Sequence, residues 1–110
     1  MIEHDLRKVY LSDFGLAIRL PNTTGTVKGR AGTPCYYSYE MVKQMPYDTR
    51  LDLWCLGVLL FEMLYGDLPF KPDPKTNDCS AAIEKLDLKI PNIRNVSQDA
   101  GELIKRLLVP

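Results

Sequence analysis

The side chains that could do chemistry in this 110-residue chain lie in five short strings between residues 12 and 70. The first is Ser12-Asp13-Phe14-Gly15, in which an aspartate follows a segment of alternating polar and apolar residues. A carboxylate at a strand end can bind a hard divalent cation, or it can simply cap a turn. Alone, this string favours the turn, so the remaining strings decide its interpretation. They are Gly32-Thr33-Pro34, Tyr39-Glu40, Asp52-Leu53-Trp54-Cys55-Leu56-Gly57 and Gly66-Asp67-Leu68-Pro69-Phe70.

Taken in this order, the five strings resemble the rear half of a eukaryotic protein kinase of the Ser/Thr type. Asp13-Phe14-Gly15 is similar to the triplet that begins the kinase activation segment, and Glu40 is similar to the glutamate of the Ala-Pro-Glu that ends it. Ser38-Tyr39 stands in the place of Ala-Pro. The Gly-x-x-Pro-Phe ending and the spacing from Glu40 to Asp52 look like Aurora-type and calcium/calmodulin-kinase-like enzymes.

The resemblance covers residues 8–110 and implies a mainly α fold. This fold is the C-terminal (large, helical) lobe of a protein-kinase-like structure, incomplete, with a short β-strand at its N-terminus. Residues 1–110 would form a partial protein kinase domain. Its expected parts are an activation segment at 13–40, a buried central helix at about 50–65 and following helices at 80–108.

The resemblance assigns Asp13, Phe14 and Gly15 to cofactor binding. Asp13 would supply a carboxylate oxygen to the magnesium that bridges the phosphates of ATP, and a hard cation prefers such a ligand. Phe14 would pack beneath the site, and Gly15 would permit backbone angles that a side chain obstructs. Gly32 and Thr33 resemble the surface that binds the substrate beside the phosphorylated residue, and this threonine is typical of kinases acting on Ser or Thr hydroxyls. The alternative at that string is an ordinary tight turn.

Activating phosphates in this family lie between the positions of Gly15 and Gly32, because a phosphate dianion can pair with arginine and order the segment. The position three residues before Gly32, where many relatives carry the phosphorylated threonine, is Gly29 in this chain. Hydroxyl residues are common in any exposed loop, so an unmodified loop is an equal alternative. The phosphorylation candidates are Thr23, Thr24 and Thr26.

Four further residues are expected to support the fold: Glu40, Asp52, Trp54 and Gly57. Asp52 stands on an otherwise apolar helix, and burying it without a partner would be costly. The resemblance implies that Asp52 braces the backbone of the catalytic loop and that Glu40 pairs with an arginine. Trp54 and Gly57 are interpreted as packing residues.

Several parts of a kinase do not occur in these 110 residues. They are the Gly-rich phosphate loop, the strand lysine with its helix glutamate, and the His-Arg-Asp catalytic loop with its Asn. The catalytic-loop aspartate and the strand lysine therefore lie outside this chain, and no catalytic residue is present. We expect part of a kinase that transfers the ATP γ-phosphate to Ser or Thr hydroxyls, inactive and marginally stable as an isolated piece. The alternatives are a non-catalytic, pseudokinase-like interaction module and a decayed duplicate without function.

Composition restricts the partners and the compartment. Lys plus Arg number 14 and Asp plus Glu number 14, so net charge attracts neither nucleic acid nor a membrane surface. The expected partner is a protein substrate with Ser or Thr, and any regulatory partner is unknown. Cys35, Cys55 and Cys79 are odd in number and lack a Cys-x-x-Cys pair, which predicts reduced thiols. The first residues lack a secretory signal pattern, which predicts an intracellular protein, cytoplasmic or nuclear.

Local patterns predict the elements that must position these groups. Residues 8–12 alternate in polarity and predict a strand that leads into Asp13. Turn-forming and polar residues at 19–30 predict a surface loop. Short helices are expected at 40–43 and 80–86, and Ser97 can cap a last helix.

The clearest predicted element is the helix that ends at Tyr65. Asp48 or Thr49 can cap its start, and Gly66 suits a left-handed turn at its end. Its apolar residues surround the helix axis instead of forming one stripe. This pattern predicts a helix that is buried on all sides.

Overall fold

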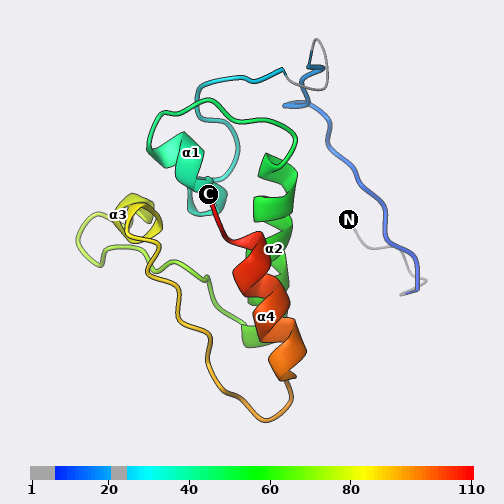
Figure 1. The fold of residues 1–110 in the computed structure, drawn as a ribbon, viewed down its shortest axis with the longest axis vertical. Coiled ribbons are helices and arrows are strands. Elements are labelled where there is room, and N and C mark those ends of the chain that lie inside the picture. The colour runs from blue at the N-terminus through cyan, green and yellow to red at the C-terminus, as the bar shows by residue number, and fades with distance from the viewer. Residues whose placement is uncertain (1–6, 21–24) are drawn as a thin grey trace.

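A computed structural model describes residues 7–20 and 25–110. Figure 1 shows two long helices side by side, two shorter helices beyond one flank of the pair, and the N-terminal segment running apart from all of them. α2 packs on α4, and α1 packs on α3. The described part of the chain is therefore mainly α, as the sequence predicts. In chain order its elements are the 3-10 turn η1 (Pro34–Tyr36), α1 (Tyr39–Val42), α2 (Leu51–Tyr65), α3 (Ser80–Glu84) and α4 (Gln98–Leu107).

The N-terminal segment does not form the strand predicted at residues 8–12. All residues from 7 to 19 are exposed, and Leu11 keeps 90% of its surface in water. A strand is stable when neighbouring strands pair with it and one face packs on a core, whereas the apolar side chains of this segment are exposed and only Val9 takes part in a bridge. Further along, Val27 and Tyr47 form an isolated antiparallel bridge and exchange two backbone hydrogen bonds of 2.9 Å.

The turn before α2 differs from the predicted cap. Arg50 is the N-cap residue, and its side chain makes no capping hydrogen bond. Asp48 Oδ1 instead accepts the backbone N–H of Arg50 at 2.9 Å, and the same carboxylate pairs with the Arg50 guanidinium. At the other end Gly66 adopts φ 72°, and its N–H donates to the Glu62 carbonyl at 2.9 Å. The left-handed stop predicted at Gly66 is confirmed.

Serine side chains cap two of the other helices. Ser97 Oγ accepts the backbone N–H of Ala100 at 3.1 Å, which confirms the predicted cap of α4. Ser38 Oγ accepts the backbone N–H of Met41 at 3.2 Å and caps α1 from a fully buried position. Ser38, which stands where the kinase Ala-Pro-Glu has its alanine, therefore supplies the hydrogen bond that caps the start of this helix.

One cluster of buried side chains forms the core on one side of α2. Trp54 stacks on Phe70 with ring centroids 5.5 Å apart and ring planes 6° apart, which ties α2 to the segment that follows it. Ile83 of α3 and Ile104 of α4 are fully buried in the same cluster. The members are Val42, Trp54, Val58, Phe61, Phe70, Cys79, Ile83, Ile104 and Leu108.

The opposite flank of α2 is in water, so the prediction of burial on all sides is wrong. Four apolar side chains of this helix keep between 44 and 73% of their surface exposed. Asp52 is also exposed, in the first turn of the helix, where the helix dipole favours a negative charge. It therefore does not need the buried partner that the sequence predicts. We call the four apolar residues the exposed α2 flank: Leu53, Leu56, Leu59 and Met63.

Gly57 of α2 lies close against the end of α4, and we predict that Gly57→Ala destabilises the chain. A Cβ at this position would lie 2.9 Å from Leu107 Cβ and 3.0 Å from Leu108 Cδ2, closer than carbon atoms pack. Overpacking of this kind costs about 1–3 kcal/mol, which exceeds the roughly 1 kcal/mol that alanine contributes to helix propensity. Urea unfolding measures the change.

The matched control for this prediction is Gly15→Ala. A Cβ there would meet only Asp13 Oδ1, at an ordinary distance of 3.6 Å. We expect no loss of unfolding free energy in the control. A stable Gly57→Ala variant would show that α2 and α4 are not in close contact.

Candidate functional site

Asp13 is exposed and comes just before a turn, in the segment that runs apart from the helices (Figure 1). Its backbone has φ 64°, in the left-handed region that aspartate and asparagine tolerate better than most residues. The Ala17 N–H donates to the Phe14 carbonyl at 3.0 Å and closes the turn. The Phe14 side chain is 68% exposed. The structure thus presents Asp13, Phe14 and Gly15 to solvent and does not bring them to the helical body.

Asp13 has the donor type that magnesium prefers, because a carboxylate oxygen is a hard ligand. Within residues 7–20 and 25–110, no group of three or more His, Cys, Asp or Glu side chains is placed to hold a metal ion. In the described part of the chain, Asp13 is therefore a single carboxylate and not a metal site by itself. The remaining ligands would have to come from ATP, water or other protein groups.

The loop from Gly32 to Tyr37 offers a second exposed surface. Gly32 adopts φ 98°, which a residue with a side chain rarely does, and Gly32 and Thr33 are both exposed. Pro34 begins η1, and the Tyr36 N–H donates to the Thr33 carbonyl at 2.9 Å. The loop is therefore a hydrogen-bonded turn that presents the Thr33 side chain outward. We call residues 32–37 the exposed loop.

A side-chain contact that the sequence did not predict anchors this loop on α2. Tyr36 Oη donates to Glu62 Oε1 at 2.5 Å. Burial, and then the hydrogen bond and the negative charge of Glu62, raise the pKa of Tyr36 to about 12. Cys55 Sγ adds a weaker contact to the Tyr36 carbonyl at 3.8 Å. The signal that could have revealed this anchor is a glutamate on the apolar helix, placed to face a tyrosine-rich turn.

We predict that the stability of the chain falls as pH rises from about 10 to about 12, and that Tyr36→Phe removes this part of the pH dependence. The pKa of Tyr36 is higher in the folded chain than its ordinary value of 10.0. The unfolded chain therefore loses this proton first, so the stabilisation is complete below pH 10 and is lost as pH approaches 12. At neutral pH the free energy of unfolding of the variant is also lower by about 1 kcal/mol or more, because the variant lacks the hydrogen bond to Glu62.

Urea unfolding of both proteins at about pH 9 and about pH 11 measures the difference, because every other titrating group is common to the two. Parallel losses of stability in the two proteins would contradict the anchor between Tyr36 and Glu62.

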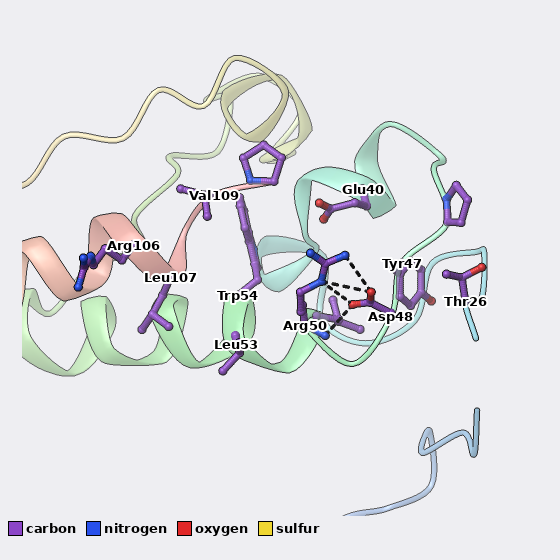
Figure 2. A pocket seen from close by; sticks show the side chains of 13 residues that line it. Thr26, Glu40, Tyr47, Asp48, Arg50, Leu53, Trp54, Arg106, Leu107 and Val109 are labelled. Atoms are coloured by element: carbon purple, nitrogen blue, oxygen red, sulfur yellow. Dashed lines mark hydrogen bonds and ion pairs between the residues drawn. The ribbon is translucent and has the colours of Figure 1, made fainter. Parts of the chain in front are cut away.

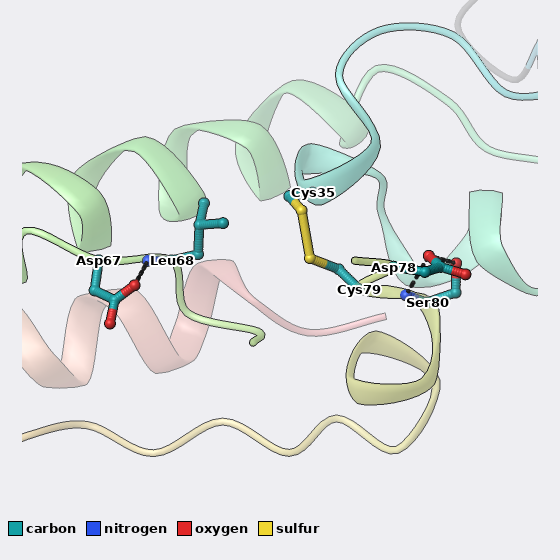
Figure 3. Close-up of a disulfide and its surroundings, with 6 residues drawn as sticks. All are labelled: Cys35, Asp67, Leu68, Asp78, Cys79 and Ser80. Carbon is teal, nitrogen blue, oxygen red and sulfur yellow. Dashed lines mark hydrogen bonds between the residues drawn. A yellow bond between two sulfur atoms is a disulfide. The ribbon is translucent and has the colours of Figure 1, made fainter. Parts of the chain in front are cut away.

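Cys35 and Cys79 form a disulfide, so the prediction of reduced thiols is wrong for this pair (Figure 3). Their Cα atoms lie 5.5 Å apart across 44 residues of sequence, a separation at which disulfides form. Sequence spacing could not reveal the pair, because the fold brings η1 to the start of α3. Cys55 is a free thiol, and burial raises its pKa. The bridge attaches the exposed loop covalently to the core.

A pocket of about 370 Å³ opens where the start of α2 meets the end of α4 (Figure 2). Glu40, Trp54 and Val109 are among its lining residues, and the Asp48–Arg50 ion pair lies at one side. The Trp54 Nε1–H is buried without a hydrogen-bond acceptor in the described part of the chain. Asp13 does not line this pocket. The pocket is therefore separate from the candidate magnesium ligand.

The structure describes one of the three phosphorylation candidates, Thr26. Thr23 and Thr24 lie outside the residues that the structure describes. Thr26 is exposed beside Val27, whose bridge to Tyr47 fixes the backbone there. Arg30 is engaged at the end of α1, where its guanidinium donates to the Met41 and Val42 carbonyls at 3.4 and 3.3 Å.

The family model of the protein kinase domain matches this chain over residues 1–110. The chain belongs to the protein kinase family. The match includes the exposed turn at Asp13, the exposed loop and all the helices. The kinase resemblance of the five strings is therefore confirmed across the whole sequence.

Relatives of this chain include Aurora kinases and other serine/threonine-protein kinases. The chain is 44% identical over 102 residues to an Aurora kinase of Saccharomyces cerevisiae. The aligned region covers 91% of this chain and 26% of that protein. The chain is 39% identical over 100 residues to an Aurora kinase of Yarrowia lipolytica, with the same two coverages. It is 30% identical over 109 residues to the human serine/threonine-protein kinase PAK 4, covering 99% of this chain and 18% of that protein. The chain thus spans about a quarter or less of these relatives.

The kinase chain has a helical body and two exposed segments that carry the family's chemical strings. Among its described residues, no helix is both long and apolar enough to cross a membrane. Trp54 and Gly57 are buried, at the Phe70 contact and the α4 contact respectively. Glu40, in the first turn of α1, is half-buried beside the pocket.

Proposed function

We propose that this chain is part of a protein serine/threonine kinase that transfers the γ-phosphate of ATP to a Ser or Thr hydroxyl of a protein substrate, and that the chain alone is inactive. The observation that carries the proposal is the family match over all 110 residues, combined with the exposure of the two chemical segments on a packed helical body. We further propose an intracellular location, cytoplasmic or nuclear.

In this proposal Asp13 is the magnesium ligand that the chain contributes, and Phe14 and Gly15 shape the backbone and packing next to the nucleotide. Magnesium, when bound with ATP, would neutralise charge on the phosphate oxygens. The exposed carboxylate fits that task in ligand type. The proposed inactivity of the isolated chain rests on the catalytic-loop aspartate and the strand lysine, which do not occur in its sequence. Glu40 and Asp52 would act as supports and not as reacting groups.

The exposed loop is the proposed substrate surface. Gly32 and Thr33 lie outward, while Tyr36 and Cys35 hold the loop to α2 and α3. A loop that is fixed at its base and open at its tip can bind an extended peptide reproducibly. Phosphorylation of Thr23, Thr24 or Thr26 is proposed as a regulatory modification of the segment between Gly15 and Gly32, because a phosphate dianion can pair with arginine.

Two measurements test the proposal. Calorimetry of the 110-residue chain with magnesium and ATP is expected to give no saturable binding. A longer product from the same transcript, if it reads in frame through a His-Arg-Asp sequence and a strand lysine, is expected to phosphorylate Ser or Thr peptides and not Tyr peptides. Micromolar binding by the isolated chain, or a longer product without these sequences, would contradict the proposal.

The exposed α2 flank favours a second candidate, a pseudokinase-like interaction module. Four apolar side chains on one helix flank make a surface that a partner protein could cover. An intact mass near 12.5 kDa for the native protein would support this candidate, since the product would then lack the catalytic parts. A mass several times larger would support the kinase.

A further inference from the structure

The Cys35–Cys79 disulfide joins the exposed loop to the start of α3 (Figure 3). Cys35 lies within η1, and Cys79 is the N-cap residue of α3. The bridge closes a ring that contains α1, α2 and the connection to α3. It therefore fixes the position of the loop relative to an element that lies 44 residues further along the chain.

We propose that Cys35 and Cys79 form a reversible thiol–disulfide modification site whose co-substrate is a low-molecular-weight thiol of the glutathione type. In the oxidised state the bridge ties the exposed loop to α3, and in the reduced state the loop keeps its turn but is released from α3. The effect on peptide binding rests on the function proposed above for this loop.

The two cysteines differ in exposure. The Cys79 side chain is 1% exposed, within the core cluster, whereas Cys35 is half-buried on the loop. An attacking thiolate must approach one sulfur of a disulfide directly, so the accessible sulfur is attacked. Cys35 Sγ is therefore the site of attack, and Cys79 is the leaving group.

The reaction balances without any other reagent. The thiolate of one glutathione forms a bond to Cys35 Sγ, the Cys35–Cys79 bond breaks, and the Cys79 thiolate takes up a proton. The thiolate of a second glutathione then forms glutathione disulfide and releases Cys35, which is also protonated. Two glutathione molecules are oxidised by two electrons in total as the protein disulfide is reduced. Glutathione disulfide drives the reverse reaction.

The structure indicates that the reduced chain stays folded. Cys79 would remain in an apolar cluster, where a free cysteine behaves as a small hydrophobic residue. Tyr36 would still donate to Glu62, and the Tyr36 N–H would still donate to the Thr33 carbonyl. The Lys43–Glu84 ion pair at 2.8 Å still joins α1 to α3. Reduction thus removes one restraint from the loop without removing the turn.

Cys55 provides an internal reference. Its Sγ lies 3.8 Å from the Tyr36 carbonyl, and burial raises its pKa, so little thiolate forms near neutral pH. It is not part of the disulfide. We therefore expect Cys55 to remain a thiol under conditions that convert the other two cysteines.

Differential alkylation of the 110-residue chain in glutathione buffers tests the proposal. Mixtures that run from reduced glutathione to glutathione disulfide should convert Cys35 and Cys79 together, with one midpoint. Alkylation after an acid quench and unfolding should modify Cys55 in every mixture. Cysteines that stay reduced in pure glutathione disulfide would overturn the proposal. A bridge that survives in pure reduced glutathione would overturn it as well, because the disulfide would then be purely structural.

Two matched variants test which sulfur is attacked. In Cys79→Ala, the accessible Cys35 should gain the mass of one glutathione when it is treated with glutathione disulfide. In Cys35→Ala, the buried Cys79 should gain none. The reverse pattern would overturn the assignment of Cys35. These readouts need no kinase activity, so they would stay unchanged if the proposed function failed. In an active longer product, a peptide KM that changes on oxidation would connect the disulfide to substrate binding.

Discussion

Asp13→Asn in an active kinase polypeptide that contains this chain is expected to lower phosphoryl transfer by about 10²- to 10³-fold, the range that follows loss of one charge-stabilising contact at a reacting centre. The amide keeps the shape of the side chain but removes the negative charge that attracts magnesium. The rate at saturating ATP, measured across a range of magnesium concentrations, checks the prediction. The loss should be partly recovered at high magnesium.

The fold explains why asparagine is the correct substitution at this position. Asp13 has φ 64°, and asparagine tolerates that backbone, whereas alanine would add strain. The side chain is exposed, so its replacement leaves no cavity and no unpaired buried charge. We expect the unfolding free energy of the 110-residue chain to change by less than about 0.5 kcal/mol. A loss of activity would then report chemistry and not misfolding.

Asp99→Asn is the matched control. This aspartate is exposed in the first turn of α4 and lies outside the five strings. It should leave phosphoryl transfer unchanged and should cost only the small contribution of a charge near a helix N-terminus. Equal activity of Asp13→Asn and Asp99→Asn would exclude Asp13 as the magnesium ligand.

The helical body was predictable because its signals are local. The left-handed turn at Gly66 and the serine cap at Ser97 each depend on residues within one helical turn. The apolar face of α4 recurs at helical spacing, and its Ile104 is buried as such a face requires. Order and spacing of the strings likewise sufficed to indicate the kinase family, since the match covers every residue.

The remaining features depend on which parts of the chain meet in space, and local pattern does not contain that information. The apolar residues on all sides of α2 predict complete burial, but other elements pack against only one side of this helix. Asp52 is exposed for the same reason. The Cys35–Cys79 bridge and the Tyr36–Glu62 hydrogen bond each join residues at least 26 positions apart.

Phe70→Ala is expected to remove most of the stability of the isolated chain. Phe70 has no exposed surface and stacks on Trp54, so truncation removes a large apolar contact and leaves a cavity beside an aromatic ring. Such substitutions cost about 3–5 kcal/mol. A small domain has a total stability of about 5–15 kcal/mol, and a chain with an exposed apolar flank should lie at the lower end. Circular dichroism with urea unfolding measures the loss, and Trp54 fluorescence reports the same site.

Phe14→Ala makes the identical chemical change at a place that the fold leaves in water. Phe14 is 68% exposed, so its loss should change the unfolding free energy of the isolated chain by less than about 0.5 kcal/mol. The two phenylalanines therefore separate burial from residue type. If both variants lost similar stability, the body and the N-terminal segment would have to share one core. If neither did, the Trp54–Phe70 stack would not support the fold.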